Sequence, residues 1–248
     1  NQIKLEEAAP YAAEDADMTL KLHKKLKANL PKNKMVTVYE TLERPLIPVL
    51  TQMENNGIKV DPLILRQMSE DFSKRLKDRA AEIYSISGSD FNIGSPKQLG
   101  EVLFDKLGLA GGKKNKTGAY GTGVEVLEEL AANGSELAVK IIEWRQISKL
   151  KSTYTDALIQ EINPATGRIH TSYSMTGANT GRLSSNSPNL QNIPIRTDEG
   201  RKIRTAFIAE SGNTLLSIDY SQIELRLLAD IANIQSLKDA FHEGIDIH

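Results

Sequence analysis

The sequence predicts an α+β fold, with long helices in the first two thirds of the chain and short strands in the last third. Apolar side chains recur at helical spacing through several long stretches before residue 161. Short β-prone runs bounded by turn residues are confined to the part after residue 167. Hydrophobic residues make up 40% of the 248 residues and charged residues 25%, which is ordinary globular usage, so the chain is able to form a packed core.

Two helices are predicted at the start of the chain. The first covers residues 5–26, which are rich in Ala, Leu, Glu and Lys. The second covers residues 36–55 and contains Pro45 and Pro48. Because proline removes a backbone donor and clashes with the preceding turn, we expect a kink or a restart near Arg44.

A turn at residues 56–57 and an extended piece at residues 58–60 lead into the third predicted helix. Asp61 is its predicted N-cap, and Pro62 stands in its first turn. Charged side chains of both signs are spread over residues 62–85, which is typical of a solvated face. A charged helix of this length needs support, so we expect a projecting arm that packs against another long helix.

The remaining elements surround a lysine-rich loop at residues 111–123. Its lysines lie where a phosphate backbone could touch them, and its low apolar content predicts a mobile segment. Further helices are predicted at residues 95–107, 124–132 and 136–161. The β-prone runs are residues 168–172, 204–208 and 214–218, and a long loop is predicted between residues 176 and 196.

Composition excludes several classes of protein. No apolar run approaches the ~20 residues that span a bilayer, so a membrane protein is not expected. The absence of cysteine excludes a disulfide scaffold and a thiolate metal site, and fits a reducing compartment. The formal net charge of −1 excludes a uniformly basic nucleic-acid coat but allows a local basic face. Because the chain begins with Asn1 rather than Met, we expect a processed or cut product.

The most informative stretch surrounds Asp219. The strand predicted over residues 214–218 ends at this aspartate, and a helix is predicted to begin at Ser221. Ser221 and Glu224 have the spacing of a capping box. A carboxylate at the end of a buried strand suits Mg²⁺, which prefers oxygen ligands. By spacing alone, Asp219 is as well explained as a turn residue at the end of a strand, and Glu224 is better explained as a helix cap than as a metal ligand.

Several stretches resemble family A DNA polymerases of the bacterial DNA polymerase I type. Residues 219–226, DYSQIELR, match the first palm motif of that family residue for residue. Eight residues without a gap leave little room for chance, and the resemblance covers nearly the whole chain. The other similar stretches are residues 91–99 (FNIGSPKQL), 143–154, 180–185 (TGRLSS) and 188–196 (PNLQNIPIR).

The resemblance implies a division into three parts. Residues 1–34 correspond to the C-terminal helix of a 3′→5′ exonuclease domain, residues 35–165 to the helical thumb and its connection to the palm, and residues 166–248 to the N-terminal part of the palm with its first catalytic motif. The expected fold is then a long-helix thumb arm joined to an incomplete antiparallel-sheet palm, preceded by the last exonuclease helix.

The resemblance also implies a reaction, the template-directed addition of dNMP to a primer 3′-hydroxyl by two-metal phosphoryl transfer. Asp219, with the backbone carbonyl of Tyr220, is expected to bind two Mg²⁺ ions. Glu224 is expected to be a steric gate against ribonucleotides. The residues expected to contact the incoming dNTP are Arg196, Ser221, Gln222, Glu224 and His248.

Contacts with primer–template DNA are implied in two places. Donors on the long loop would meet the acceptors that every base pair presents in the minor groove, unless they bond to the loop's own backbone. Cations and hydroxyls on the long helix would follow the DNA backbone, unless they form a solvated face. The loop residues are Thr180, Arg182, Asn189, Gln191 and Asn192. The thumb residues are Asn92, Ser95, Arg145, Lys149, Lys151, Ser152 and Thr153.

The 248-residue piece itself is expected to bind duplex DNA without catalysing synthesis. Tyr11 and Asp15 resemble a remnant of the last exonuclease motif, but two-metal hydrolysis needs several converging carboxylates. The family's fingers helix and last palm motif are also missing, and one carboxylate holds Mg²⁺ poorly. The alternatives are a non-catalytic duplex-binding module and a single-subunit RNA polymerase relative; Glu224 argues against the latter. We expect a monomer of the bacterial cytoplasm, associated with the nucleoid and not with a membrane.

Overall fold

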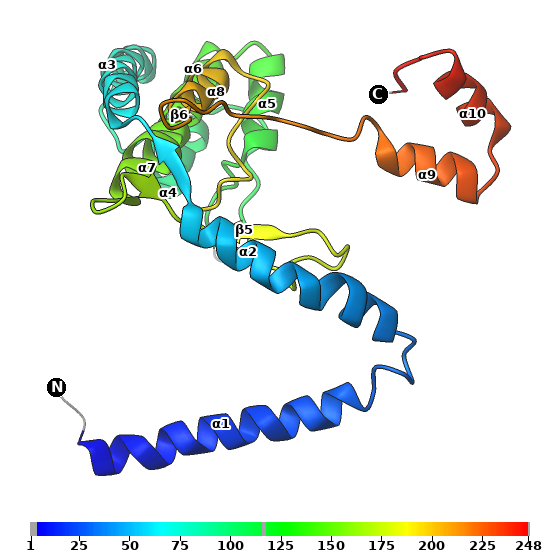
Figure 1. Ribbon diagram of the computed structural model, residues 1–248. Coiled ribbons are helices and arrows are strands. Elements are labelled where there is room, and N and C mark those ends of the chain that lie inside the picture. Colours follow the sequence, from blue (N-terminus) through cyan, green and yellow to red (C-terminus); the bar gives the residue numbers. More distant parts are fainter. Residues whose placement is uncertain (1–3, 116–117, 248) are drawn as a thin grey trace. The chain divides into compact units, whose positions relative to one another are not determined.

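The computed structural model describes residues 4–115 and 118–247 (Figure 1). The chain divides into two compact units, Asn1–Ile208 and Ala209–His248, which are described separately. It is mostly helical with small antiparallel sheets, so the predicted α+β class is confirmed in part. Within the described ranges, no helix is both long enough and apolar enough to cross a membrane.

The two helices predicted at the start of the chain are present. The first is α1 (Leu5–Lys27). The second consists of the π-helical turn η1 (Val38–Glu43) followed by α2 (Arg44–Asn56). Near the expected kink or restart, the π-helical turn changes to α-helix at Arg44, and the backbone of Glu43 and Arg44 stays helical. Pro45 takes a first-turn position of α2 that tolerates proline. Gly57 ends α2 with a φ of +58°, and a Cβ there would lie 2.5 Å from the carbonyl oxygen of Ile169. Only glycine fits this position without moving the neighbouring strand.

The first hydrophobic core lies between the charged helix and its predicted partner. The elements are α3 (Pro62–Ser87), α4 (Pro96–Gly100), η2 (Glu101–Lys106), α5 (Val124–Ala132) and α6 (Glu136–Leu150). The Asp61 carboxylate caps α3 by accepting a hydrogen bond from the Leu63 N–H at 2.8 Å. Helix α6 packs along α3, and the most deeply buried residues here are Ile83, Leu99, Leu103, Leu127 and Ile141.

A chain of ion pairs joins α3 to α6 beside this core. Arg79 of α3 lies 2.7 Å from Glu82 and 2.9 Å from Glu143 of α6. Lys140 of α6 lies 2.9 Å from Glu82. Hydrogen bonds from Lys140 and Arg79 lower the pKa of Glu82, and its hydrogen bond to Glu82 raises the pKa of Arg79. Ion pairs that water screens contribute little to stability, so this network aligns the helices more than it stabilises them.

The second core lies near the first turns of α3, beneath a four-stranded antiparallel sheet of order β2-β3-β1-β6. Its strands are β1 (Ile58–Val60), β2 (Ile162–Asn163), β3 (Arg168–Ile169) and β6 (Phe207–Ile208). The helical elements η3 (Lys151–Asp156), α7 (Ala157–Gln160) and α8 (Asp198–Thr205) complete this part. The residues buried here include Val60, Leu65, Leu158, Ile169 and Ile203.

Helix α8 was not predicted, and the prediction of an extended run over residues 204–208 is wrong in its first half. The signals for the helix were Thr197, whose hydroxyl accepts a hydrogen bond from the Gly200 N–H at 3.1 Å, and the acidic pair Asp198 and Glu199 in the first turn. The glycine and the dense charge obscured the apolar pattern that usually identifies a helix.

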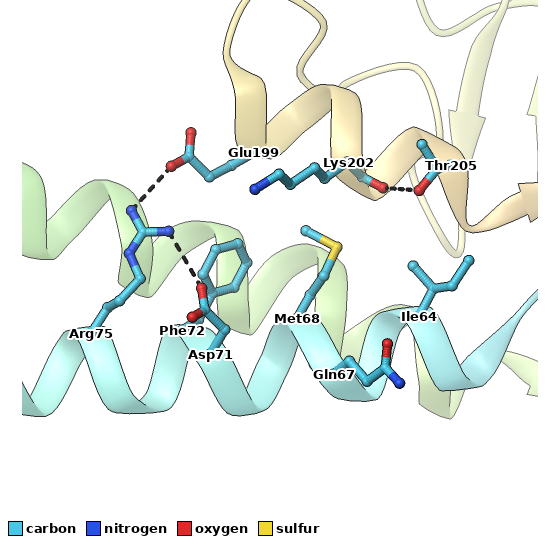
Figure 2. Close-up of a pocket in the computed structure, with 9 residues that line it drawn as sticks. All are labelled: Ile64, Gln67, Met68, Asp71, Phe72, Arg75, Glu199, Lys202 and Thr205. Carbon is cyan, nitrogen blue, oxygen red and sulfur yellow. Dashed lines mark hydrogen bonds and ion pairs between the residues drawn. The ribbon is translucent and has the colours of Figure 1, made fainter.

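Helices α3 and α8 are tied together over a small pocket of about 290 Å³ (Figure 2). Arg75 of α3 lies 3.0 Å from Glu199 of α8 and 3.6 Å from Asp71. The pKa of Glu199 is lowered by its backbone N–H and by the hydrogen bond from Arg75. Figure 2 shows Phe72 and Met68 on the α3 side, so the pair spans a partly apolar gap between the helices.

A separate two-stranded ribbon lies around the predicted loop between residues 176 and 196. It consists of β4 (Ser172–Ser174) and β5 (Ser184–Asn186), with Tyr173 opposite Ser185. The ribbon is tied to α2, because the Tyr173 N–H donates to the Glu54 carboxylate at 2.6 Å. Strand β5 was missed because its serines carry no apolar alternation.

Two predictions about the second unit are wrong. Residues 214–218 form no strand, because no other segment of that unit in the described part of the chain pairs with them; Leu216 and Ile218 are both 82% exposed. Helix α9 (Ile223–Ile231) begins after Ser221, and its N-cap is Gln222 with a φ of +53°. Ser221 therefore makes no capping box with Glu224. The last helix is α10 (Gln235–His242).

Asp156 links η3 to α3 and carries a pH-dependent contribution to stability. Its carboxylate accepts hydrogen bonds from Lys151 at 2.6 Å and from the Ser69 hydroxyl of α3 at 2.5 Å. Burial opposes ionisation of the Asp156 carboxyl, but these hydrogen bonds outweigh burial and hold its pKa below the ordinary value.

Replacing Asp156 by Asn is expected to lower the free energy of unfolding by about 0.5–1 kcal/mol at pH 7, a figure reduced for partial exposure. A pKa lowered on folding stabilises above the unfolded-state pKa, and this contribution is lost as the pH falls through the folded-state pKa. Urea unfolding at pH 7 and pH 3 should show a larger difference between wild type and variant at pH 7. Asp78→Asn, an exposed change on α3, is the control. Equal differences at both pH values would contradict the assignment.

Candidate nucleic-acid interface

A shallow hollow of about 590 Å³ brings together residues from two distant parts of the chain, among them several that were predicted to contact DNA. Arg145 and Lys149 of α6 and Ser152 of η3 line one side. Gly94 and Pro96, which flank Ser95 at the start of α4, line another. Tyr120 and Thr122 of the loop before α5 close it.

The hollow is positively charged, because none of the described residues that line it is acidic and Arg145 and Lys149 are cations. Lys149 is exposed, whereas Arg145 is half-buried. The Arg145 guanidinium donates to the carbonyl oxygen of Thr122 and, at 3.4 Å, to its hydroxyl. Burial lowers the pKa of Arg145, but a guanidinium remains charged in proteins. Cations beside hydroxyls are the groups that bind phosphate oxygens.

The other predicted thumb residues differ in what holds them. The Lys151 ammonium bonds to Asp156 and to the Ser69 hydroxyl at 3.0 Å, which favours a structural role over the predicted DNA contact. Thr153 and Asn92 are exposed. Asn92 accepts a hydrogen bond from the Gly94 N–H at 3.0 Å, and Ser95 accepts one from the Gln98 N–H at 3.4 Å as the N-cap of α4.

A second groove, of about 650 Å³, lies between α6 and the loop at residues 176–196, which is called the polar loop below. Lys149 lines it together with Tyr154 of η3 and with Asn192 and Pro194 of the loop. Unlike the hollow, it also contains Arg75, Arg79, Glu143 and Glu199, so cations and anions are mixed. Lys149 lines both cavities and therefore connects the helix surface to the loop surface.

All five loop residues that were predicted to contact DNA are exposed. They are Thr180, Arg182, Asn189, Gln191 and Asn192. Gln191, however, bonds to the loop itself: its amide nitrogen donates to the Leu183 carbonyl at 3.1 Å, and its amide oxygen accepts from the Ser185 N–H at 3.2 Å. For Gln191 the alternative of a self-bonded polar loop is what the structure shows, and its contact with DNA stays a prediction.

Three long side chains hold the backbone at the C-terminal end of the loop. The Tyr154 hydroxyl donates to the Asn192 carbonyl, Arg204 donates to the Ile193 carbonyl at 3.1 Å, and Arg201 donates to the Arg196 carbonyl at 3.1 Å. Burial raises the pKa of Tyr154, so its hydroxyl keeps the proton that it donates. The sequence indicated only positive charge at positions 201 and 204; their spacing of three on one helix was the available signal.

The predicted catalytic residues lie in the second unit. Asp219 and Glu224 are exposed, as is Ser221, and Tyr220 is 79% exposed. The Gln222 side chain donates to the Asp246 carboxylate at 2.6 Å. Of the other predicted nucleotide contacts, Arg196 is exposed in the first unit, and His248 lies outside the described residues.

The oxygen donors offered for Mg²⁺ are the Asp219 carboxylate and the Tyr220 carbonyl. Across residues 4–115 and 118–247, no three Asp, Glu or His side chains form a cluster able to hold a metal ion. Asp219 and Tyr220 therefore fit part of a magnesium site and do not make a complete one. Tyr11 and Asp15 are exposed on α1, one turn apart, and belong to no such cluster.

Comparison with protein families gives one match over most of the chain. The profile described as "DNA polymerase family A" matches residues 63–248. This range contains the hollow, the polar loop and the segment around Asp219, and it excludes α1.

Relatives and solved structures agree with the family match. The chain is 56% identical to DNA polymerase I of Rhizobium leguminosarum over 99% of this chain, and 51% identical to DNA polymerase I of Pseudomonas aeruginosa over all of it. It spans about a quarter of the length of these curated relatives, 24% and 27%. A solved structure described as the POL domain of Pol1 from M. smegmatis in complex with DNA primer-template and dNTP matches with a TM-score of 0.83 and 39% identity, covering 92% of this chain and 40% of that one.

Replacing Gly200 by Ala is expected to destabilise the chain by about 1–3 kcal/mol through overpacking. A Cβ at Gly200 would lie 2.5 Å from the Pro194 carbonyl oxygen, so α8 and the loop would have to separate. This cost should outweigh the gain in helix propensity, since Ala stabilises the interior of a helix by roughly 1 kcal/mol relative to Gly. Urea unfolding measures the change. Gly121→Ala, whose Cβ would meet nothing closer than 3.9 Å, is the control and should differ little; no difference between the two variants would contradict the steric argument.

Proposed function

The chain belongs to DNA polymerase family A, and from this premise we propose that its parent protein is a DNA-directed DNA polymerase of DNA replication and repair. The proposed reaction adds dNMP to a primer 3′-hydroxyl opposite a template. The 3′ oxygen forms a bond to the α-phosphorus of the dNTP, and the bond to the departing pyrophosphate breaks. We further assign residues 1–34 to the end of an exonuclease domain, 35–165 to the thumb and 166–248 to the start of the palm.

Duplex binding is the role proposed for the first unit, and the acid-free hollow is the observation that carries it. Arg145, Lys149 and Ser152 converge there from α6 and η3, although the whole chain has a net charge of −1. Contacts to phosphate position a duplex without reading its sequence, as an enzyme that copies any template requires. The relative from M. smegmatis, described with bound primer-template, supports this assignment.

The polar loop is the proposed minor-groove reader. Arg182, Asn189 and Asn192 are exposed donors on a backbone held by Tyr154 and by α8. Purine N3 and pyrimidine O2 offer acceptors at equivalent places in every correct base pair, so such donors sense pair geometry and ignore sequence.

Asp219 and the Tyr220 carbonyl are proposed as part of the site for two Mg²⁺ ions. When bound, such ions polarise phosphate oxygens and stabilise the charge of the leaving group. The residues proposed to contact dNTP are Arg196, Ser221, Gln222, Glu224 and His248, with Glu224 excluding the 2′-hydroxyl. The isolated 248-residue chain is proposed to bind duplex DNA only. A function as a duplex-binding module alone is therefore the second candidate, favoured by the incomplete set of metal ligands.

Replacing Lys149 by Ala should weaken binding of the 248-residue chain to duplex DNA equally for unrelated sequences. Losing one phosphate contact should reduce the slope of log affinity against log salt by about 1. Fluorescence anisotropy with two unrelated duplexes over a range of salt concentrations measures both effects. Lys77→Ala, which removes an exposed lysine of α3 outside both cavities, is the matched control. An unchanged slope would remove Lys149 from the interface.

Replacing Asp219 by Asn in the full-length parent protein should reduce primer extension by at least about a hundredfold and leave duplex affinity within about twofold. Asp230→Asn, an exposed change on α9, should keep extension near that of the wild type. In the same assay, Glu224→Ala should raise incorporation of ribonucleotides. Full extension by Asp219→Asn would contradict the catalytic assignment. Wild-type preference for ribonucleotides would favour the RNA polymerase alternative, and no extension by the wild-type parent would favour a binding module.

A further inference from the structure

Two buried hydroxyl groups lie beneath the polar loop. Ser185 of β5 is fully buried, and Thr171, just before β4, is 6% exposed. Their oxygens are 2.6 Å apart. In contrast, the side chains proposed to reach DNA from this loop, including Arg182 and Asn192, are exposed. The loop therefore has a polar interior where most folded segments have an apolar one.

The hydroxyl pair bonds to the loop backbone on both sides of Pro188. Thr171 Oγ1 lies 3.0 Å from the Asn186 carbonyl oxygen and 2.8 Å from that of Pro188. Ser185 Oγ lies 3.1 Å from the same Pro188 carbonyl and accepts a hydrogen bond from the Leu190 N–H at 3.1 Å. The two hydroxyls have two protons between them, so they donate two bonds at any moment while Ser185 also accepts one. Removing the Ser185 hydroxyl takes away the acceptor of the Leu190 N–H, and removing the Thr171 hydroxyl takes away a donor to the Asn186 carbonyl.

The Gln191 amide extends this set of bonds along the loop. It bridges the Leu183 carbonyl and the Ser185 N–H, and the Gln191 N–H itself donates to the Asn189 side chain at 3.0 Å. The Gln191 side chain thus connects Leu183, which follows Arg182, and Gln191 itself, which precedes Asn192, to Ser185.

The ribbon that carries the loop offers little other support. Strands β4 and β5 have three residues each, and two-stranded ribbons are marginally stable in water. Five of these six residues are Ser or Asn, so cross-strand apolar contact is limited to Tyr173. The conformation of the loop therefore depends on the buried hydroxyls to an unusual degree.

We propose that Thr171 and Ser185 are positioning residues that hold Arg182 and Asn192 against the minor groove of the primer terminus. The hydroxyls do not touch DNA; they fix the backbone from which the donors project. This inference rests on the proposed function, because it assigns a purpose to loop rigidity only if the loop reads base pairs.

The test compares primers that end in guanine with primers that end in 3-deazaguanine, which lacks the N3 acceptor of the minor groove. In the full-length wild-type parent protein, this replacement should lower kcat/KM for extension about tenfold, the effect of one hydrogen bond to a charged donor. Ser185→Ala should extend the guanine primer about tenfold more slowly. For this variant the further loss on 3-deazaguanine should shrink to about threefold or less, because the donor is no longer in place.

The ratio of kcat/KM for the guanine primer to kcat/KM for the 3-deazaguanine primer separates loss of positioning from general destabilisation of the enzyme. A partly unfolded enzyme has fewer active molecules, so both primers are extended more slowly and the ratio is unchanged. Ser87→Ala is the matched control, because Ser87 is also a buried serine whose hydroxyl bonds to backbone carbonyls, but at the end of α3. It should keep the wild-type ratio.

Variants of the second hydroxyl provide an independent measurement. Thr171→Val keeps the shape of the side chain and removes the hydroxyl, so the ratio should shrink as for Ser185→Ala. Thr171→Ser keeps the hydroxyl and should restore the wild-type ratio. Thr155→Val removes another fully buried hydroxyl, in η3, and serves as its control.

The outcomes distinguish this inference from the proposed function. If 3-deazaguanine slows the wild type and the Ser185→Ala variant by the same factor, the positioning role is overturned and the proposed function is not. A wild type that extends both primers equally leaves no minor-groove contact to position and overturns it as well, while polymerase activity stands. A wild-type parent without any extension activity overturns the proposed function and this inference together.

Discussion

The packing of α3 against α6 and η3 is the contact on which the rest of the first unit depends. Helix α3 contributes Ile83 to the first core and Leu65 to the second. The continuous helical path of α6 and η3 does the same with Ile141 and Tyr154. Two neighbouring helices thus connect both cores, and α4, α5, α7, α8 and the four-stranded sheet attach to one core or the other. The hollow lies on α6 and η3, so its geometry is fixed by the most buried contact of the unit.

The same contact explains how a chain with a net charge of −1 presents a basic surface. Two acidic residues of α6 and η3 are used against α3 or against their own helix: Glu143 pairs with Arg79, and Asp156 bonds to Ser69 and Lys151. Arg145 and Lys149 remain on the side of the hollow. Exposed ion pairs stabilise a fold little. The consequence of this arrangement is therefore the position of Arg145 and Lys149, which line a hollow without acidic residues among those described.

Helical periodicity was sufficient to predict α3, α5 and the path from α6 to α7, because each buries apolar side chains that the sequence displays at helical spacing. It also predicted α1, although the apolar side chains of this helix, such as Leu22 and Leu26, are exposed. It failed where the determinant lies outside the segment. Residues 214–218 have the composition of a strand, but a strand also needs a partner, and none pairs with them in the described part of their unit. The exposed site residues were predicted from motifs, and their roles stay predictions. Thr171 and Ser185 could not be predicted, since serine and threonine near turns usually lie at the surface, and only the fold shows that these are buried.

A loop that presents donors to a groove has to expose polar groups on one side and still keep one conformation. An apolar interior would stabilise it without directing it, because apolar contacts are not directional, whereas each hydrogen bond fixes a particular carbonyl or N–H. Tyr154, Arg201, Arg204 and the two hydroxyls together fix the carbonyls at positions 186, 188, 192, 193 and 196. Directional support of this kind is fragile, since the loss of one partner leaves a buried group unpaired. That fragility is the reason to expect that a single buried hydroxyl controls how well the loop presents its donors.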